Sequence, residues 1–229
     1  RYLKGERNIT IYPYLDYILS EKEYESTKRY EKDRLFWIEE LKNFEINYFS
    51  NKEVYCTHSN RLYFILNKEL CDRIKTYCKA HSISEYALFF SALAIKYFKT
   101  TQKEDFFIGT PILNRYHNKE ENMLGVFVNT VPVRINIKND DSFSSFCDKT
   151  MDKILSCFRH QKYHYTQLLK NVSQESNNKT KLFDVLFSFW NVKTHNESNA
   201  EWFSCCNQLE SLQIHIDDRK SEEQYLVNY

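Results

Sequence analysis

Three histidines are the first candidates for chemistry in this sequence. His160 and His164 are four residues apart, a spacing that suits a zinc-binding pair on one face of a helix. No glutamate stands between them in the H-E-x-x-H pattern, and no third ligand is obvious. We therefore expect these two to be surface or packing histidines. His215 lies in an alternating segment, where we expect it to be solvated or hydrogen-bonded rather than catalytic.

Two adjacent pairs of reactive side chains lie further along. Asp217 and Asp218 could act as an acid–base pair, but they are expected at the start of a turn, where carboxylates cap backbone amides. Cys205 and Cys206 could form a redox site, although the sequence contains no C-x-x-C pair. The G-x-S-x-G elbow, the P-loop and the G-x-G-x-x-G loop are also absent from the sequence. The residues alone indicate no self-contained active site and no metal site.

Bulk composition indicates a globular protein with room for a core. The 229 residues suffice for one large domain or two small ones, and 42% of them are hydrophobic. A net charge of +1 without a basic run gives no indication of nucleic acid or of an acidic membrane surface. No apolar run reaches membrane-spanning length, and the N-terminus does not resemble a signal peptide. Seven irregularly spaced cysteines indicate reduced thiols in a cytoplasmic protein.

Glycine and proline concentrate in one short part of the chain. Of three glycines and three prolines, Gly109, Pro111, Gly125 and Pro132 all fall between residues 108 and 135. Glycine frees the backbone angle φ and proline fixes it, so the sequence specifies the backbone most closely here. We expect such a stretch to serve function.

The order of helical and strand patterns predicts a mixed α/β fold. Helical spacing predicts a helix over 21–43, and a nearly all-apolar pattern after Ser82 or Ser84 predicts a buried helix. Alternation predicts a strand over 125–137, in which Pro132 requires a bulge or an edge position. We expect helices on one face of a sheet made of non-sequential strands. The other expected elements are strands at 61–66, 106–109, 182–192, 212–216 and 224–229, and helices after Asn67, from Ser142 to 158, and at 165–172.

The glycine- and proline-rich stretch resembles the condensation domains of nonribosomal peptide synthetases. Their signature in this region reads roughly I-G-T-P-x-x-x-R and then G-x-F-V-N-T-x-x-x-R. So many matches in one order form a far more specific signal than a lone short motif. The matching positions are Ile108, Gly109, Thr110, Pro111, Arg115, Gly125, Phe127, Val128, Asn129, Thr130 and Arg134.

Weaker matches extend the resemblance over nearly the whole chain. Residues 14–17 resemble the family's Y-x-D-Y segment, 159–169 its H-Q-x-x-P-F-x-x-L segment, and 181–192 its P-L-F-x-V-x-F-x-x-x-N strand. The departures affect fine substrate contacts more than the fold. They are Leu113 and Asn114 in place of small residues, His164 and Tyr165 in place of Pro-Phe, and Lys181 in place of proline.

The resemblance implies an α/β (α+β) lobe with a mixed sheet and packed helices, one half of a two-lobed fold like that of chloramphenicol acetyltransferase. The family's acid–base motif, His-His-x-x-x-Asp-Gly, is absent from the sequence; in the family it precedes the Y-x-D-Y segment. We therefore expect residues 1–20 to connect to a missing N-terminal lobe and residues 21–229 to be the C-terminal lobe. The polar segment 193–210 is expected to be a latch to the other lobe, anchored by Trp202 and Phe203, or plain surface decoration.

The resemblance also implies roles for single residues. Asn129 is expected to hydrogen-bond a substrate amide or a developing oxyanion, or else to satisfy buried backbone groups. Arg115 and Arg134 are expected to form structural ion pairs or to be exposed, or else to contact a carrier protein or the pantetheine phosphate. Neither a catalytic residue nor a metal ligand is expected in this chain. The residues expected to border the substrate channel are Gly109, Thr110, Pro111, Leu113 and Asn129.

The implied reaction joins an aminoacyl thioester to an upstream acyl thioester to form an amide. No cofactor is expected to bind directly, because both substrates arrive on the phosphopantetheine of carrier domains. The implied partners are the missing lobe, peptidyl or acyl carrier domains and an adenylation domain, with no nucleic acid and no membrane. The alternatives are a related CoA- or carrier-dependent O- or N-acyltransferase, and a non-catalytic module that docks carrier proteins.

Overall fold

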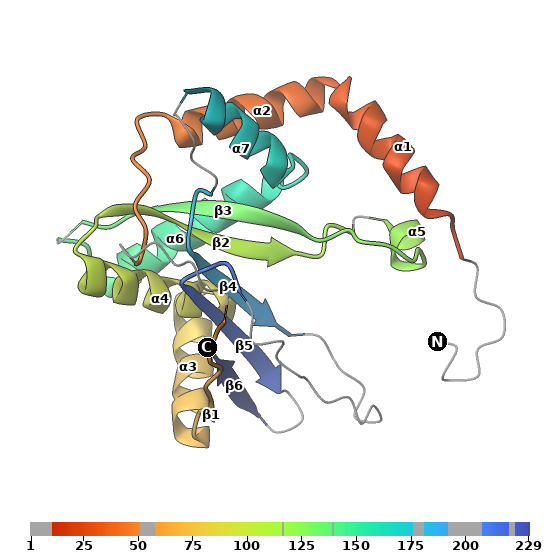
Figure 1. Cartoon of the computed structure of the whole chain (residues 1–229). Coiled ribbons are helices and arrows are strands. Elements are labelled where there is room, and N and C mark those ends of the chain that lie inside the picture. Colours follow the sequence, from red (N-terminus) through yellow and green to blue (C-terminus); the bar gives the residue numbers. More distant parts are fainter. Residues whose placement is uncertain are drawn as a thin grey trace.

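Six strands form one mixed sheet in the order β1-β6-β5-β4-β2-β3 (Figure 1). The computed structural model describes residues 11–50, 58–115, 117–138, 140–175, 181–191, 208–219 and 223–229. β2, β4 and β5 run parallel to one another, and the remaining pairs are antiparallel. This confirms the predicted mixed sheet of non-sequential strands. The strands are β1 (Tyr63–Ile65), β2 (Asp105–Ile112), β3 (Asn129–Asn136), β4 (Val185–Trp190), β5 (Leu212–Arg219) and β6 (Gln224–Asn228).

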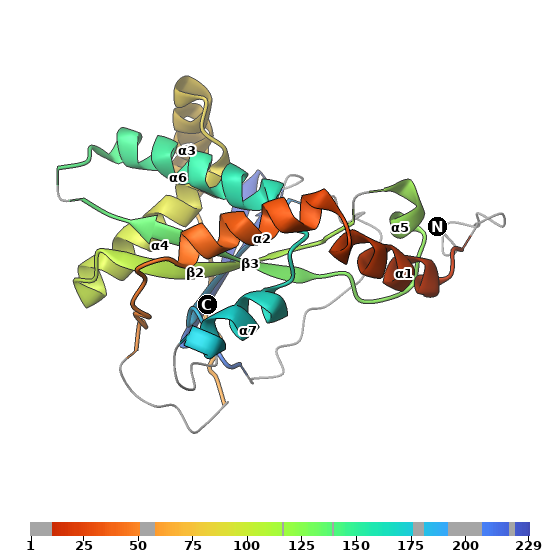
Figure 2. The same cartoon turned by 90° about the horizontal axis from the view of Figure 1, so that it is seen from above.

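Helices cover both faces of the sheet rather than one. α3 (Lys68–His81), α4 (Glu85–Thr101) and α6 (Phe143–Arg159) lie on one face, and α7 (Tyr165–Glu175) lies on the other (Figure 2). Tyr97 of α4 stacks on Phe106 with ring centroids 3.9 Å apart. The expectation of helices on one face was wrong because consecutive residues of β2, such as Phe106 and Phe107, are both buried. A strand buried on both sides needs cover on both faces.

The predicted helix over 21–43 is two helices, α1 (Tyr14–Glu25) and α2 (Lys28–Leu41). The break lies at Ser26 and Thr27. Thr27 accepts a hydrogen bond from the backbone N–H of Tyr30, so it caps the start of α2. The end of α2 reaches β3, where Arg134 donates hydrogen bonds to the carbonyls of Glu40 and Lys42.

Three further helix starts follow the predicted capping residues. Asn67, Ser84 and Ser142 each accept a hydrogen bond from the backbone N–H three residues on. Of the two candidates before α4, Ser84 is the cap. Ser82 instead ends α3 in a left-handed conformation with φ of 55°.

The strand limits near the glycines differ from the prediction. β2 does not end at Gly109 but continues to Ile112, and β3 begins at Asn129 rather than at residue 125. The strands end there because their mutual pairing ends with Ile112 and Asn129. Pro132 lies on the terminal strand of the sheet, as its missing N–H predicted.

An arm of residues 113–128 connects β2 to β3 and projects from the sheet (Figure 1). It contains the short helix α5 (Asn118–Glu121). Helix α1 packs on the arm through a small second core made of Tyr17, Met123 and Phe127. The position of α1 and that of the arm are therefore coupled.

A buried carboxylate joins the α1–α2 pair to the end of α6. Asp33 is fully buried and accepts a hydrogen bond from the Tyr24 hydroxyl at 2.6 Å. It also contacts Arg29 at 2.9 Å and His160 Nδ1 at 2.6 Å. The backbone oxygen of His160 accepts a hydrogen bond from Trp37 Nε1. These contacts fix the turn between α6 and α7 against α1 and α2. Helix α1 in turn packs on the arm.

Within the described ranges, none of the helices has the length and apolar character that crossing a membrane requires.

Candidate functional site

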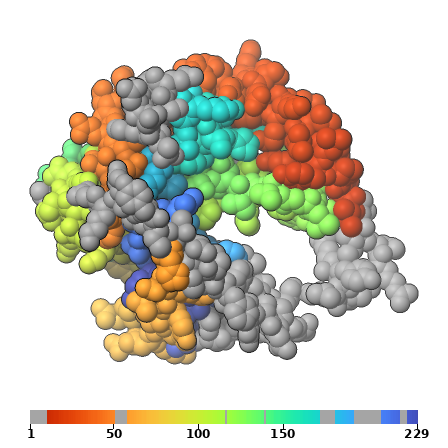
Figure 3. Space-filling model, viewed as in Figure 1, coloured from red at the N-terminus to blue at the C-terminus, as the bar shows by residue number. Residues whose placement is uncertain are grey.

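β2 and β4 part at their carboxyl ends. These parallel strands are in register at Gly109 and Leu186, and beyond that pair β2 runs towards the arm while β4 runs away from it (Figure 1). A space-filling view shows a hollow beneath the green arm (Figure 3). Open α/β sheets bind ligands at the carboxyl ends of their strands, where neighbouring connections diverge. We refer to the surface formed by residues 111–113, 124–128 and 188–190 as the wedge.

The arm carries a row of exposed aliphatic side chains. Phe127 packs against Tyr17 of α1, with ring centroids 4.4 Å apart. The alternate residues Leu124, Val126 and Val128 are not part of the core that packs against α1. Their exposed fractions are 79%, 78% and 58%. We refer to these three residues as the aliphatic row; they belong to the arm, which borders the hollow in Figure 3.

Both glycines of the signature lie against aromatic rings. A β-carbon on Gly109 would come within 2.2 Å of the ring of Phe183. A β-carbon on Gly125 would come equally close to the ring of Tyr14, whose hydroxyl donates a hydrogen bond to the Val126 carbonyl. Close approach of side chains is therefore the reason for glycine at these two positions.

The predicted channel residues of β2 occupy different depths. Thr110 is fully buried, and its hydroxyl is 2.6 Å from the Tyr86 hydroxyl of α4. Pro111 is half-buried, whereas Leu113 is 67% exposed. Of these three, Pro111 and Leu113 contribute to the wedge surface, and Thr110 supports it from behind.

Asn129 connects β3 to the turn between α6 and α7. Its Nδ2 donates to the Gln161 carbonyl at 2.9 Å and to the Tyr163 carbonyl at 3.4 Å. Its Oδ1 accepts from the N–H groups of Thr130 and Tyr165. The side chain is buried, and every one of these partners is a backbone group. Contact between Asn129 and a substrate stays a prediction.

Arg115 holds the arm in a compact form. Its guanidinium donates hydrogen bonds to the carbonyls of Glu120, Met123 and Gly125. The same group lies over the ring of Phe127, 3.9 Å from its centroid. Arg115 thereby ties both ends of the 120–127 segment to the end of β2.

Arg134 has a comparable role at the far end of β3. It pairs with Asp105, with N–O distances of 2.5 and 2.9 Å, and donates to the carbonyls of Glu40 and Lys42. The hydrogen bonds that it donates to Asp105 raise the pKa of Arg134. These bonds anchor the end of α2 to the sheet, which fits a structural role.

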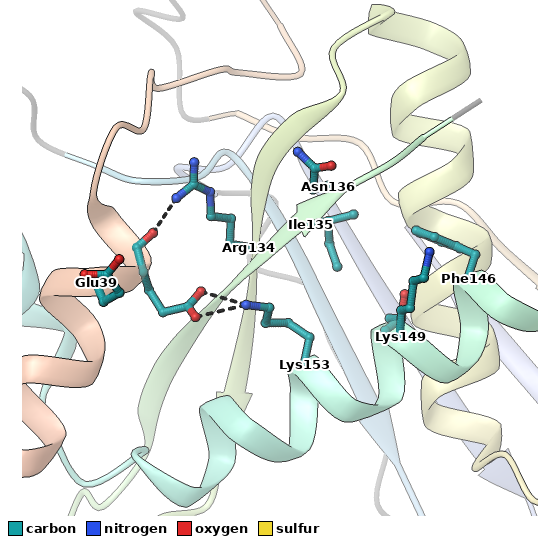
Figure 4. A pocket seen from close by; sticks show the side chains of 9 residues that line it. Glu39, Arg134, Ile135, Asn136, Phe146, Lys149 and Lys153 are labelled. Atoms are coloured by element: carbon teal, nitrogen blue, oxygen red, sulfur yellow. Dashed lines mark hydrogen bonds and ion pairs between the residues drawn. The ribbon is translucent and has the colours of Figure 1, made fainter. Parts of the chain in front are cut away.

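A pocket of about 330 Å³ lies beside Arg134, between α2, β3 and α6 (Figure 4). Lys153 of α6 pairs with Glu40 across it at 2.9 Å. Lys149 pairs with Asp141. The pocket therefore holds matched charges, and it lies at the end of β3 opposite to Asn129 and the wedge.

A chain of polar side chains crosses β4 and β5 beside the wedge. Ser188 and His215 are direct neighbours in the parallel register, and the Ser188 hydroxyl is hydrogen-bonded to His215 Nδ1. Trp190 Nε1 donates to Ser188 Oγ at 3.2 Å. His215 Nε2 is 3.3 Å from Gln213 Oε1, and Gln213 donates to Glu210 at 2.6 Å. We refer to Ser188, His215, Gln213 and Glu210 as the relay.

A neutral His215 suits the relay. Because Gln213 Oε1 only accepts, His215 Nε2 carries a hydrogen, and in the neutral ring Nδ1 then accepts the hydrogen of the Ser188 hydroxyl. Burial, aided by the charge of Arg61, lowers the pKa of His215, which agrees with this assignment. The prediction of a hydrogen-bonded histidine is confirmed. The pairing with Ser188 was missed, because two strands that are distant in sequence bring the side chains together.

The remaining histidine and aspartate candidates have structural positions. His160 pairs with Asp33, and His164 pairs with Glu21 of α1, so both are packing histidines. Asp217 lies within β5 and not at the start of a turn, so that prediction was wrong: pairing with β6 extends the strand to Arg219.

The predicted redox pair and the latch cannot be placed, whereas metal ligands and most cysteines can be checked in the described residues. Cys205, Cys206 and the latch anchors Trp202 and Phe203 lie outside the described residues. In the described part of the chain, no three histidine, cysteine or acidic side chains are grouped to hold a metal ion. The described cysteines are free and buried: Cys71, Cys78, Cys147 and Cys157.

Comparison with known proteins gives consistent matches. The family model described as Condensation domain matches residues 2–227. Surfactin synthase subunit 1 of Bacillus subtilis (strain 168) is 31% identical over 216 residues, which are 90% of this chain and 6% of that protein. Tyrocidine synthase 3 of Brevibacillus parabrevis is 27% identical over 195 residues, 82% of this chain and 3% of that protein. The chain thus spans a small part of these relatives.

Solved structures share the fold. The condensation domain of the monacolin K polyketide synthase MokA superposes with a TM-score of 0.82 at 16% identity, covering 99% of this chain and 57% of that chain. The starter condensation domain of rhizomide synthetase RzmA superposes with a TM-score of 0.76 at 14% identity, covering 96% of this chain and 51% of that one. The sequence match over nearly the full length and this common architecture lead to one conclusion: the chain belongs to the condensation-domain family.

Proposed function

We propose that this chain forms one wall of the substrate passage of a condensation domain that joins two carrier-bound groups by an amide. The observation that carries the proposal is that both signature segments converge on the wedge. One ends β2 and the other leads into β3, and the arm between them carries the exposed aliphatic row. In support, a mutant of the rhizomide synthetase starter condensation domain was solved in complex with C8-CoA and Leu-SNAC.

In the proposed reaction, the acceptor amine attacks the donor thioester carbonyl. A C–N bond forms, the C–S bond breaks, and the carrier thiol leaves. The apolar wedge excludes water that would hydrolyse the thioester. Pro111 and Leu113 line the passage, while Gly109, Thr110 and Asn129 fix the backbone behind it. We assign proton transfer to a His-His-x-x-x-Asp-Gly motif in chain beyond these 229 residues.

The proposal includes the wider assembly. Residues 1–20 would connect to a further lobe, which places the boundary at residue 20 within α1. The partners would be that lobe, carrier domains that present substrates on phosphopantetheine, and an adenylation domain, all in the cytoplasm. In support, the four-domain synthetase AB3403 includes a part that superposes on 91% of this chain with a TM-score of 0.74.

Formation of a dipeptide on a carrier tests the proposal. The chain is compared with a fusion in which an N-terminal lobe bearing the paired histidines precedes residue 1, each supplied with loaded donor and acceptor carriers. We expect mass spectrometry to find dipeptidyl thioester with the fusion and none with the 229-residue chain.

Each other outcome has a defined meaning. Product from the 229-residue chain refutes the assigned division of roles. Carrier binding without product in the fusion supports a docking module, and acyl transfer to a free hydroxyl acceptor supports the acyltransferase alternative.

A further inference from the structure

The pocket between α2, β3 and α6 has the size of a small-molecule site (Figure 4). Its volume of about 330 Å³ lies at the lower end of the range found for ligand pockets. Ile135 of β3 and Phe146 of α6 line it, and both are almost fully buried, so they give the pocket an apolar part. A ligand at this place would touch three elements of the fold at once.

One buried hydroxyl among the lining residues has no hydrogen-bond partner. Thr150 of α6 is 2% exposed, and its Oγ1 makes no hydrogen bond with any described residue. A helical threonine can donate to the carbonyl one turn earlier, as Thr101 of α4 does to Tyr97. Leaving a buried hydroxyl unsatisfied is costly. The pocket therefore offers a hydrogen bond that the chain itself does not use.

Charged groups of both signs border the pocket. Lys149 and Lys153 are four residues apart on α6, so they lie on the same side of the helix. Glu39 and Glu40, at the end of α2, bring negative charges. A ligand with one charge would meet a repelling group as well as an attracting one. A zwitterion can place each of its charges beside the opposite one.

The internal ion pairs leave bonding capacity for such a ligand. An ammonium has three donors, and the Lys153 ammonium is engaged by the two oxygens of Glu40, at 2.9 and 3.1 Å. Lys149 pairs with one oxygen of Asp141, and its side chain is 58% exposed. The side chain of Glu39 is 74% exposed. A ligand can thus add ion pairs to these groups without breaking those already formed.

We propose that this pocket binds a free α-amino acid with an apolar side chain. The carboxylate of the amino acid pairs with Lys149 and Lys153, and Thr150 donates a hydrogen bond to it. The ammonium pairs with Glu39, and the side chain packs on the apolar part of the pocket. This inference does not rest on the proposed function.

A series of related probes tests the charge requirement on the 229-residue chain, with dissociation constants measured by ¹H–¹⁵N NMR titration. L-Leucine carries both charges, N-acetyl-L-leucine only the negative one and L-leucinamide only the positive one. We expect leucine to bind at least about threefold more tightly than either analogue, because each analogue loses an ion pair. Glycine, which lacks the apolar side chain, should also bind more weakly than leucine.

Thr150→Val separates the hydrogen bond to the ligand from the stability of the fold. Valine has nearly the same shape but no hydroxyl, so the midpoint of urea unfolding without ligand should stay equal or rise. Leucine binding should weaken about two- to tenfold. Ser156→Ala is the control, because Ser156 also belongs to α6 but does not line the pocket, and its leucine binding should equal that of the native sequence.

Three results would overturn the proposal. The first is the absence of saturable resonance shifts with leucine. The second is binding of N-acetyl-leucine or leucinamide as tight as that of leucine, since the pocket would then select a single charge. The third is undiminished leucine binding in Thr150→Val, which would mean that the hydroxyl does not meet the ligand. Because binding is measured directly, dipeptide formation by the fusion has no bearing on the result.

Discussion

Gly109 lies where β2 meets the ring of Phe183, and this contact leaves no space for a side chain. Gly109→Ala places a β-carbon 2.2 Å from that ring. The ring is buried between Gly109 and Tyr165, so it has little freedom to move away. We expect the substitution to lower the free energy of unfolding by about 1–3 kcal/mol, measured by urea denaturation.

A second substitution shows whether the ring is the cause. In a double-mutant cycle with Phe183→Leu, Gly109→Ala should cost much less when the ring has been replaced than when it is present. Equal cost in both backgrounds would mean that backbone strain, and not the ring, makes glycine necessary.

The arm is the element whose shape depends most on one side chain. Arg115→Met removes the hydrogen bonds to the carbonyls of Glu120, Met123 and Gly125 but keeps an apolar stem. We expect faster amide hydrogen exchange over residues 120–127, with exchange in the central helix α4 unchanged, because the arm is remote from the main core. Mass spectrometry of deuterated peptides measures both.

Lys119→Met is a matched control on the same arm, because the Lys119 ammonium lies over the ring of Tyr12 without tying the arm's ends together. Equal exchange in the two variants would contradict the role given to Arg115.

At the scale of the whole molecule, the aliphatic row is an exposed surface, and its function depends on the substrate passage that we propose it borders. Val126 is 78% exposed, so Val126→Asp should leave the unfolding transition of the 229-residue chain almost unchanged. In the fusion described above, the same carboxylate would enter the proposed passage, and we expect dipeptide formation to fall at least about tenfold. Urea denaturation and product mass spectrometry measure the two effects.

Leu155→Asp provides the comparison, since Leu155 is 47% exposed on α6 and is not part of the wedge. Its activity in the fusion should equal that of the native sequence. If Val126→Asp is as active as Leu155→Asp, the wedge is not the passage.

The sequence by itself determined what depends on local chemistry. The polar caps at Asn67, Ser84 and Ser142 begin their helices because each satisfies a backbone N–H of its own first turn. The glycines and prolines marked the constrained stretch, and the order of residues within it indicated the family.

Only the tertiary structure decided what depends on pairing between distant segments. β2 lies beside β4 and not beside β1, and it parts from β4 after Gly109, which opens the wedge. Ser188 meets His215 because β4 and β5 pair in one particular register, and a shift of one residue would turn the two side chains to opposite faces. Which strands pair, and in which register, depends on which faces of all the strands and helices become buried together. No short stretch of sequence therefore specifies these contacts.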